Sequence, residues 1–385
     1  MEKRVRMLDD NRDRQPPEGK LLSRREFLKG ISLVGALALI PSFLYSCIRQ
    51  EQPTPQLLPS LPIPAGRVSL VRTRNRMEGV RRAIKLLQCN PVQGKAVVLK
   101  PNYNFPLPAP CCTHDDTVRS LIQTLREMGT THITMAERSW CEISTRRVLE
   151  EMGIFNLAEE LDIDIVNLQE TEPDEWVHLH PNGSQHWNNG FEFPRVYHEA
   201  QSIVQTCLLK THGMGGNFTM SLKNAVGMLR PGPDYTPPLN EWRGTGNWPW
   251  GRGHPYYPWL GEMHRSPHIR KMIAEINLAY KPDIVVLDGV DAFVTGGPTE
   301  GKVAATNVIL AGSDRVAIDA VGVAILRLFD TTPAISDDPI FEQEQIARAA
   351  ELDLGIKTAN QIQLITDDSK GEAFAAQIRD ILLKG

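Results

Sequence analysis

Charged or polar side chains stand at the ends of four short apolar runs in this sequence. In chain order they are Lys100 with Asn102, Glu137, Lys210 with His212, and Asp288 with Asp291. Ligand sites of open α/β sheets lie outside the carboxyl ends of the strands, so side chains from several strand ends meet at one crevice. Any single one is equally well explained by a chain that re-enters water there. Their repetition at four ends predicts a functional site.

A glycine-rich stretch follows the third of these runs. Residues 210–229 read KTHGMGGNFTMSLKNAVGML, in which Gly215 and Gly216 allow a positive φ or a close approach of the backbone to a ligand. The residues from Thr219 onward predict a helix whose N-terminal amides and Lys223 face an anion. The alternative is an ordinary glycine turn with Lys223 on a solvated face. The stretch is neither a Walker A loop nor a G-x-G-x-x-G fingerprint.

Together these residues predict a site for a small anionic substrate, a carboxylate or a phosphate. The predicted binding residues are Lys100, Asn102, Lys210, Gly215, Gly216, Lys223 and Asn224. Lysines in such a site stabilise negative charge that develops on the substrate. The predicted acid/base groups are His212, Asp288 and Glu137, because a carboxylate held ionised beside lysines can act as a base.

A divalent metal ion is a second chemistry that the sequence leaves open. The candidate ligands are His114, His212, Asp288 and Asp291. Their nitrogen and oxygen atoms suit zinc, iron or manganese. Against a metal, the sequence has no H-E-x-x-H spacing. Asp115 and Asp116 are also favourable at a helix start through the helix dipole alone.

The cysteines add a third alternative. None of the six stands in a C-x-x-C pair, so the sequence contains no iron–sulfur cluster motif. The vicinal pair Cys111 and Cys112 lies in the same predicted loop as Lys100. In one interpretation this pair is redox-active or binds a soft metal, and in the other it is structural, either buried or disulfide-bonded.

The apolar periodicities predict an α/β fold. Strands are predicted at 95–100, 132–137, 163–168, 202–209, 283–290, 306–312 and 361–366. Helices are predicted at 114–129, 145–153, 155–162, 268–280, 313–329 and 341–352. Their alternation predicts a mostly parallel sheet with helices on both faces, either as one unit or split into two lobes.

Three segments interrupt this alternation. Residues 171–200 are polar and predict a hairpin or a longer excursion, and residues 231–268 form a long irregular insertion rich in aromatic residues. The insertion is either an aromatic lid or a loop that packs its own rings. A second glycine-rich element, residues 294–302, is either an anion-binding loop or a plain hairpin connection.

The N-terminal residues predict export. Arg24 and Arg25 precede an apolar run, 31–45, that is too short and too interrupted by Pro41 for a membrane span. We therefore interpret residues 1–46 as a signal peptide for the twin-arginine export machinery. The next residue, Cys47, follows a lipoprotein-like cleavage box and predicts a lipid anchor to the membrane. Residues 47–66 predict a proline-rich tether, and residues 67–385 the folded domain.

Composition limits the classes of partner. The formal net charge is −4 over 385 residues, and removal of the basic N-terminus makes the remainder more negative. A nucleic-acid partner is therefore not expected. The predicted location is the periplasm or the outer face of the membrane.

Four blocks in order resemble a known family. They are VVLKPN, LLKTHGMGGNFTMSLKNAVGML, DIVVLDGVDAFVTGGPTEG and ILAGSDRVAIDAVG. Together they are similar to the domain-of-unknown-function family 362 (DUF 362), from about residue 94 to about residue 357. Some members of that family carry twin-arginine signals, as this chain does by our interpretation, and others carry a ferredoxin-type domain whose cysteine spacing is missing here. The blocks coincide with Lys100, Asn102, Lys210, His212, Lys223, Asn224, Asp288, Gly301, Asp314 and Asp319.

The sequence therefore favours an exported enzyme that acts on a small anion, with or without a metal. A non-catalytic binding or accessory lipoprotein of the cell envelope is the alternative of a different class. A redox protein is the third, and it rests mainly on the export signal.

Overall fold

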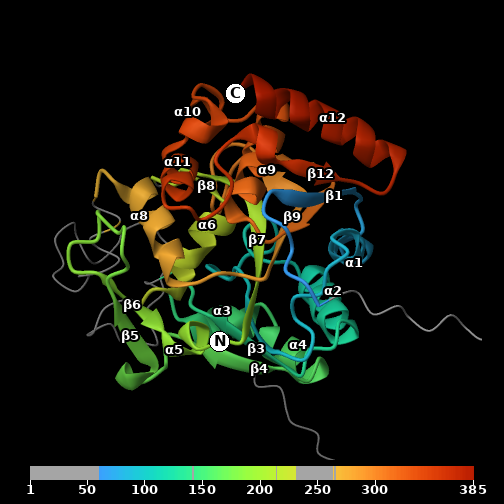
Figure 1. Cartoon of the computed structure of the whole chain (residues 1–385). Helices are drawn as coiled ribbons and strands as arrows, with labels where there is room; N and C mark the ends of the chain where they lie inside the picture. Colours follow the sequence, from blue (N-terminus) through green and yellow to red (C-terminus); the bar gives the residue numbers. More distant parts are fainter. Residues whose placement is uncertain (1–59, 141–142, 214, 231–262, 264–265) are drawn as a thin grey trace, which may run out of the picture. The chain divides into compact units, whose positions relative to one another are not determined.

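A mixed sheet organises the protein in the computed structural model (Figure 1), which describes residues 60–140, 143–213, 215–230, 263 and 266–385. Its strands are β1 (Arg67–Arg72), β2 (Ala96–Lys100), β3 (His132–Glu137), β4 (Asp164–Asn167), β7 (Ser202–His212), β8 (Asn217–Thr219), β9 (Ile284–Phe293), β10 (Val303–Ala304), β11 (Val308–Gly312) and β12 (Gln363–Ile365). A separate two-stranded sheet pairs β5 (Trp176–Leu179) with β6 (Phe191–Pro194).

The longer α-helices connect and cover these strands. They are α1 (Arg76–Leu86), α2 (Asp115–Glu127), α3 (Thr145–Glu151), α4 (Ile154–Glu160), α8 (Ile269–Ile276), α9 (Arg315–Leu328), α11 (Glu344–Glu351) and α12 (Ser369–Lys384). Three four-residue α-helices are α5 (Arg195–His198), α6 (Ser221–Asn224) and α10 (Pro333–Ser336). The 3-10 turns are η1 (Pro173–Glu175), η2 (Ala225–Met228), η3 (Asn277–Ala279), η4 (Ile340–Glu342) and η5 (Ala359–Gln361).

The sheet is mostly parallel, as predicted. Its strand order is β12-β1-β11-β9-β7-β2-β3-β4, with β8 paired to the end of β7 and β10 to the end of β9. Along this order only β11 runs antiparallel to its neighbours. Central parallel strands are buried on both faces, and every residue of β7 is buried, its polar residues included. Lys210 and His212 are thus part of a buried strand rather than of a loop beyond it.

Helices cover both faces of the sheet. On one face α1, α2, α3 and α4 pack with strand residues such as Leu99 and Val204 in a common core. On the other face α9, α11 and α12 pack against residues such as Leu209 and Leu287. The β5–β6 hairpin and α8 enclose a third cluster, with Trp187 at its centre. Figure 1 shows α1 and α2 on one side of β7 and α8 on the other.

Most predicted elements are present, with one correction that concerns the site. The segment from Thr219 onward was expected to be one helix, but Thr219 ends strand β8, and the residues after it form the four-residue α6 and the 3-10 turn η2. A hairpin causes the difference, because Thr219 pairs with Lys210 on β7 before the chain turns into α6. Residues 171–200 contain the β5–β6 hairpin, as one of the two interpretations proposed.

Several expectations lie outside the described residues. Residues 1–59, with the predicted signal peptide and Cys47, are among these, and so are residues 231–262 of the predicted insertion. The described residues belong to one compact unit, residues 56–385, and not to two lobes. Within the described part of the chain, no helix is both long and apolar enough to cross a membrane.

Candidate anion-binding site

A pocket lies where the segments after β2 and β3 meet the β7–β8 hairpin. Its lining residues are Asn102, Asn104, Phe105, Arg138, Trp140, His212, Thr219, Lys223, Asn224, Val226, Gly227 and Pro298. Its volume is about 30 Å³, room for roughly one or two water molecules. The pocket therefore suits a small polar ligand, or the anionic end of a larger one.

Lys223 is the buried cation of this pocket that lacks a partner. The residue is only 8% exposed, and no hydrogen bond or ion pair joins its ammonium group to the described part of the chain. Burial, with a smaller contribution from the charge of Lys210, lowers the pKa of Lys223 to about 7. Burying a charge without a partner is costly, so an anion that enters the pocket gains more here than at a surface lysine.

A glycine fixes where the Lys223 side chain runs. A Cβ atom added to Gly216 would lie 2.7 Å from Cε of Lys223 and 2.8 Å from its Cδ. The aliphatic stem of the lysine therefore rests on the backbone of Gly216. Gly216, a predicted binding residue, thus lies against Lys223, whereas Gly215, with its positive φ of 86°, makes the turn between β7 and β8.

The helix N-terminus that was expected to receive an anion is already occupied. Asp319 of α9 accepts hydrogen bonds from the amide and the hydroxyl of Ser221, both at 2.7 Å, and from the amide of Leu222 at 3.1 Å. Burial raises the pKa of Asp319 to about 6. Asp319 thus holds α6 in place, and the amides of α6 are not the anion site.

Uncharged polar groups complete the pocket. The Nδ2 amide of Asn102 donates to Oδ1 of Asn224 at 3.1 Å, and Asn224 in turn donates to the carbonyl of Thr206 at 3.1 Å. Thr219 is 2% exposed, and its hydroxyl oxygen has no hydrogen-bond partner among the residues that the structure describes. An unsatisfied buried hydroxyl beside a buried lysine is a second indication that the pocket holds a polar ligand.

Lys210 stands behind the pocket and does not line it. It is fully buried, and its Nζ donates to the carbonyl of Cys111 and, at 3.4 Å, to Oδ1 of Asn102. Burial lowers the pKa of Lys210. Its contribution to an anion site is therefore electrostatic, through its charge and through the orientation of Asn102.

Cys111 and Cys112 are buried free thiols in the structure, so the disulfide alternative is wrong for this pair. Burial opposes ionisation of Cys112, but the hydrogen bond from Cys111 and the charge of Lys210 lower the pKa of Cys112 to about 7. Sγ of Cys112 also donates to the carbonyl of Phe105 at 2.9 Å.

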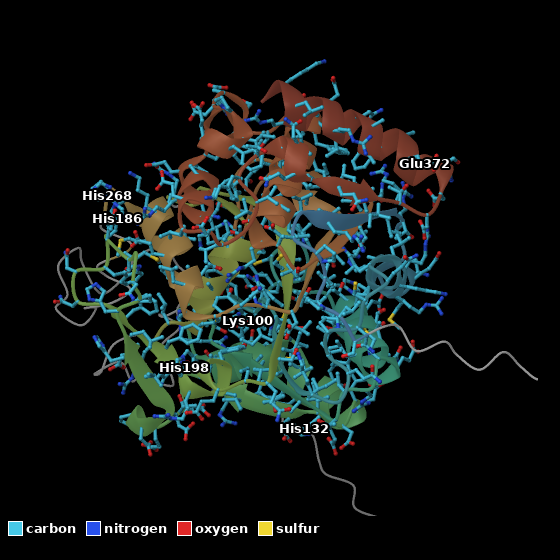
Figure 2. The ribbon with its side chains drawn as sticks, viewed as in Figure 1. Lys100, His132, His186, His198, His268 and Glu372 are labelled. Carbon is cyan, nitrogen blue, oxygen red and sulfur yellow. The ribbon has the colours of Figure 1, made fainter. Side chains whose placement is uncertain are left out.

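Lys100 and Glu137, both predicted site residues, form a buried ion pair next to the pocket. Nζ of Lys100 lies 2.6 Å from Oε1 of Glu137, and each side chain is 1% exposed. Burial lowers the pKa of Lys100, while the charge of Glu137 acts in the opposite direction. The amides of Tyr103 and Arg138 also donate to Glu137, at 2.9 Å and 2.8 Å. Figure 2 shows Lys100 in the interior of the molecule.

Arg138 was not among the predicted site residues, yet it lines the pocket. Its guanidinium donates to the carbonyls of Ser139 at 2.8 Å and Val226 at 2.6 Å. Arg138 and Trp140 directly follow β3, so the rule that strand ends deliver site residues could have found both. Thr219 has no such signal, because only its cross-strand pairing with Lys210 brings it to the pocket.

Asp288 lies outside the pocket lining, with its carboxylate fully engaged. Its Oδ2 accepts from the hydroxyl of Thr117 at 2.7 Å and from Nε of Arg76 at 2.9 Å, and its Oδ1 accepts from the amide of Val290 at 3.0 Å. Arg76 also binds Asp291 at 2.8 Å. Arg76 itself was not predicted, because nothing in its helical context marks it.

The four predicted metal ligands do not come together. Asp288 and Asp291 bind Arg76, and His114 caps α2 by accepting from the amide of Asp116 at 3.1 Å. Of the four, His212 alone lines the pocket. Across the described ranges, no three His, Cys, Asp or Glu side chains form a group that could hold a metal ion. The predicted ligand set is therefore corrected.

Comparisons with known proteins give one family. The family model described as "Domain of unknown function (DUF362)" matches residues 97–324. The thylakoid-associated protein sll1697 of Synechocystis sp. (strain ATCC 27184 / PCC 6803 / Kazusa) is 26% identical over 247 residues, which is 62% of this chain and 65% of that protein. The lactate racemase apoprotein from Thermoanaerobacterium thermosaccharolyticum aligns with 64% of this chain and 54% of its own, at 12% identity and a TM-score of 0.36.

Proposed function

This chain is a member of the DUF362 family, and we propose that it is an enzyme that binds a small anion, a carboxylate or a phosphate, in the pocket around Lys223. The observation that carries the proposal is a lysine that is 8% exposed and has no partner among the described residues. A bound anion would supply the missing negative charge. The unsatisfied hydroxyl of Thr219 would donate to the same anion.

The remaining pocket residues divide the work between orientation and proton transfer. The side chain of Asn224 is held by Asn102 and by the Thr206 carbonyl, and it would orient the ligand. His212 lines the pocket and is the residue that we assign to proton transfer. Glu137 and Asp288 are not assigned this role, because each already accepts hydrogen bonds from several donors, including a cationic side chain.

Anion titration of the purified protein tests this function. Calorimetry with sulfate, inorganic phosphate and pyruvate should show binding to the natural chain. Lys223→Met should weaken the tightest of these at least about tenfold, the equivalent of about 1.4 kcal/mol. Lys281→Met, which removes an exposed lysine, is the matched control and should bind normally. Equal affinity in Lys223→Met and the natural chain, or no binding of any of the three anions, would overturn the proposal.

We further propose that the protein is exported by the twin-arginine route and lipid-anchored at Cys47. The support is the sequence of residues 1–47, together with a relative whose name places it at a membrane system. Replacing Arg24 and Arg25 by lysine should retain the protein in the cytoplasm, and Cys47→Ser should release an exported protein from the membrane. Unchanged fractionation of both variants would contradict the route and the anchor.

A further inference from the structure

We infer that Lys223 is a covalent nucleophile and that the substrate is a small 2-oxo carboxylate, which forms a Schiff base with its Nζ. This inference rests on the proposed anion site and goes beyond it, because an anion site needs only a charge near the ligand. A Schiff base needs an amine that is not held by a partner and that points at a carbonyl carbon.

The geometry around Lys223 meets the first requirement. Among the described residues this amine has no hydrogen bond and no carboxylate neighbour, unlike Lys100, whose Nζ is held by Glu137 and by the Pro101 carbonyl at 2.6 Å each. The stem of Lys223 is supported against Gly216, which limits the directions in which the amine can reach. A buried amine held by its stem and left without a partner is suited to attack a bound electrophile.

A Schiff base also needs a population of neutral amine near pH 7, and the charge environment of Lys223 supplies it. Burial and the like charge of Lys210 lower the pKa of Lys223 to about 7. No carboxylate from the described part of the chain lines the pocket, so none of these residues stabilises the protonated amine by pairing with it. A lysine desolvated next to another cation is the recognised way in which proteins produce a nucleophilic amine.

The other pocket groups select the ligand class. The cationic Arg138, the amide of Asn224 and the hydroxyl of Thr219 line the pocket and would face the carboxylate, whose negative charge a simple aldehyde could not offer to Arg138. The volume of about 30 Å³ is room for roughly two water molecules, so the pocket receives the carboxylate end of the ligand and not the whole of it. A short 2-oxo acid combines the carboxylate with the adjacent carbonyl carbon.

The reaction balances without an oxidant or a reductant. The neutral amine of Lys223 adds through its lone pair to the carbonyl carbon and gives a carbinolamine, with the nitrogen proton passing to the former carbonyl oxygen. Protonation of that hydroxyl, by a group such as His212, lets it leave as one water molecule. The product is an iminium ion between Lys223 and the carbon that carried the carbonyl oxygen. Its positive charge withdraws electrons from that carbon's neighbours.

Reductive trapping tests the inference. The natural chain is incubated with pyruvate and sodium cyanoborohydride, and the protein is analysed by intact mass and by peptide mapping. The expected result is one reduced pyruvate adduct per chain, located at Lys223. The adduct should be absent in Lys223→Met and in Lys223→Arg, and should be retained in Lys281→Met. Trapping should also be several-fold faster at pH 8 than at pH 6, because the amine is neutral there.

The outcomes separate this inference from the proposed function. Pyruvate binding by calorimetry without an adduct at Lys223 at either pH overturns the Schiff base and leaves the anion site standing. An adduct spread over exposed lysines, equal in Lys223→Met, also overturns it. No binding of any anion together with no adduct overturns both proposals. If Lys223→Met fails to fold, Lys223→Arg and the position of the adduct in the natural chain decide the question.

Discussion

Two buried lysines near one end of the sheet have opposite surroundings. Lys100 ends β2, and its Nζ is 2.6 Å from a carboxylate that also accepts from two backbone amides. Lys223 lies in the short α6, lines the pocket, and has no partner in the described part of the chain. Burying the Lys100–Glu137 ion pair costs desolvation energy, which the contacts of the pair inside the protein offset. Lys223 has no such contact with the described residues, and a bound anion would provide it.

The comparison teaches that a lysine at a strand end is not evidence of a site by itself. Lys100 was predicted as a binding residue from its strand end and Lys223 from the helix expected after the glycine-rich stretch, and they differ in whether a carboxylate reaches them. Residues with a partner hold the walls of the pocket. Residues without one are candidates for the chemistry.

The largest effect is expected from breaking the ion pair between Lys100 and Glu137. Glu137→Gln would leave the Lys100 ammonium buried without a counter-charge, which costs about 3–5 kcal/mol of folding free energy. Chemical denaturation of the purified protein measures this. Lys100→Met combined with Glu137→Gln should recover part of the loss, because no unpaired charge remains. A loss below about 1 kcal/mol in Glu137→Gln would show that the pair does not support the fold.

The pH dependence of sulfate binding tests whether the unpaired Lys223 holds the anion through its charge. The charged form of Lys223 holds the anion, and its pKa is about 7. Affinity should therefore fall above pH 7, by up to about tenfold per pH unit. Lys223→Arg stays charged and should show a flatter profile, with any remaining slope assigned to His212. Identical profiles in the two proteins would contradict the role of Lys223.

Deprotonation of Lys223 has the opposite effect on the ligand-free protein, because it makes the free energy of unfolding rise with pH. The folded pKa of Lys223 is lowered from 10.5 to about 7. Between these values the unfolded chain holds the proton and the folded chain does not, so this group's contribution to the free energy of unfolding rises with pH. Comparing denaturation at pH 7 and pH 9 in the natural chain and in Lys223→Met measures it. The free energy of unfolding should increase less in the variant than in the natural chain. An equal increase in both would rule out this contribution of Lys223.

The smallest effects are expected at two glycines, one beside each lysine. A Cβ on Gly227 would lie 2.9 Å from Nζ of Lys100 and 3.1 Å from Oε1 of Glu137, atoms fixed by their ion pair. Gly227→Ala should therefore destabilise the fold by about 1–3 kcal/mol. Gly216→Ala displaces only the flexible stem of Lys223, so it should cost less stability and weaken sulfate binding several-fold. Thermal melts with calorimetry distinguish the two, and the reverse pattern would contradict this assignment.

Sequence reasoning found the fold class and about a third of the pocket-lining residues. Strands ending at Lys100 and Glu137 were predicted because parallel strands are apolar throughout and change character abruptly at their ends. Of the predicted site residues, Asn102, His212, Lys223 and Asn224 line the pocket. Thr219 was missed because it was expected to begin a helix, whereas it ends the β7–β8 hairpin and reaches the pocket through its pairing with Lys210.

The predicted metal ligands and acid/base carboxylates have other partners in the structure, for a related reason. Asp288 was predicted as a base beside lysines, but Arg76 of α1 reaches it from 212 residues away in sequence. Partners so distant are set by how helices pack on the sheet, and no local pattern marks them. The same holds for Asp319, which occupies the amides of α6 that were expected to receive an anion.

The sequence by itself determined which chemical groups stand where the strands end, because alternation of apolar runs and helical periods depends on local burial alone. The tertiary structure decided which of these groups already have partners. Glu137 reaches Lys100 because β3 pairs beside β2, while the β7–β8 hairpin and Asp319 turn α6 so that Lys223 enters the pocket without a carboxylate. Charge pairing in a buried site depends on distances of a few ångströms between distant segments, and only the folded chain sets those distances.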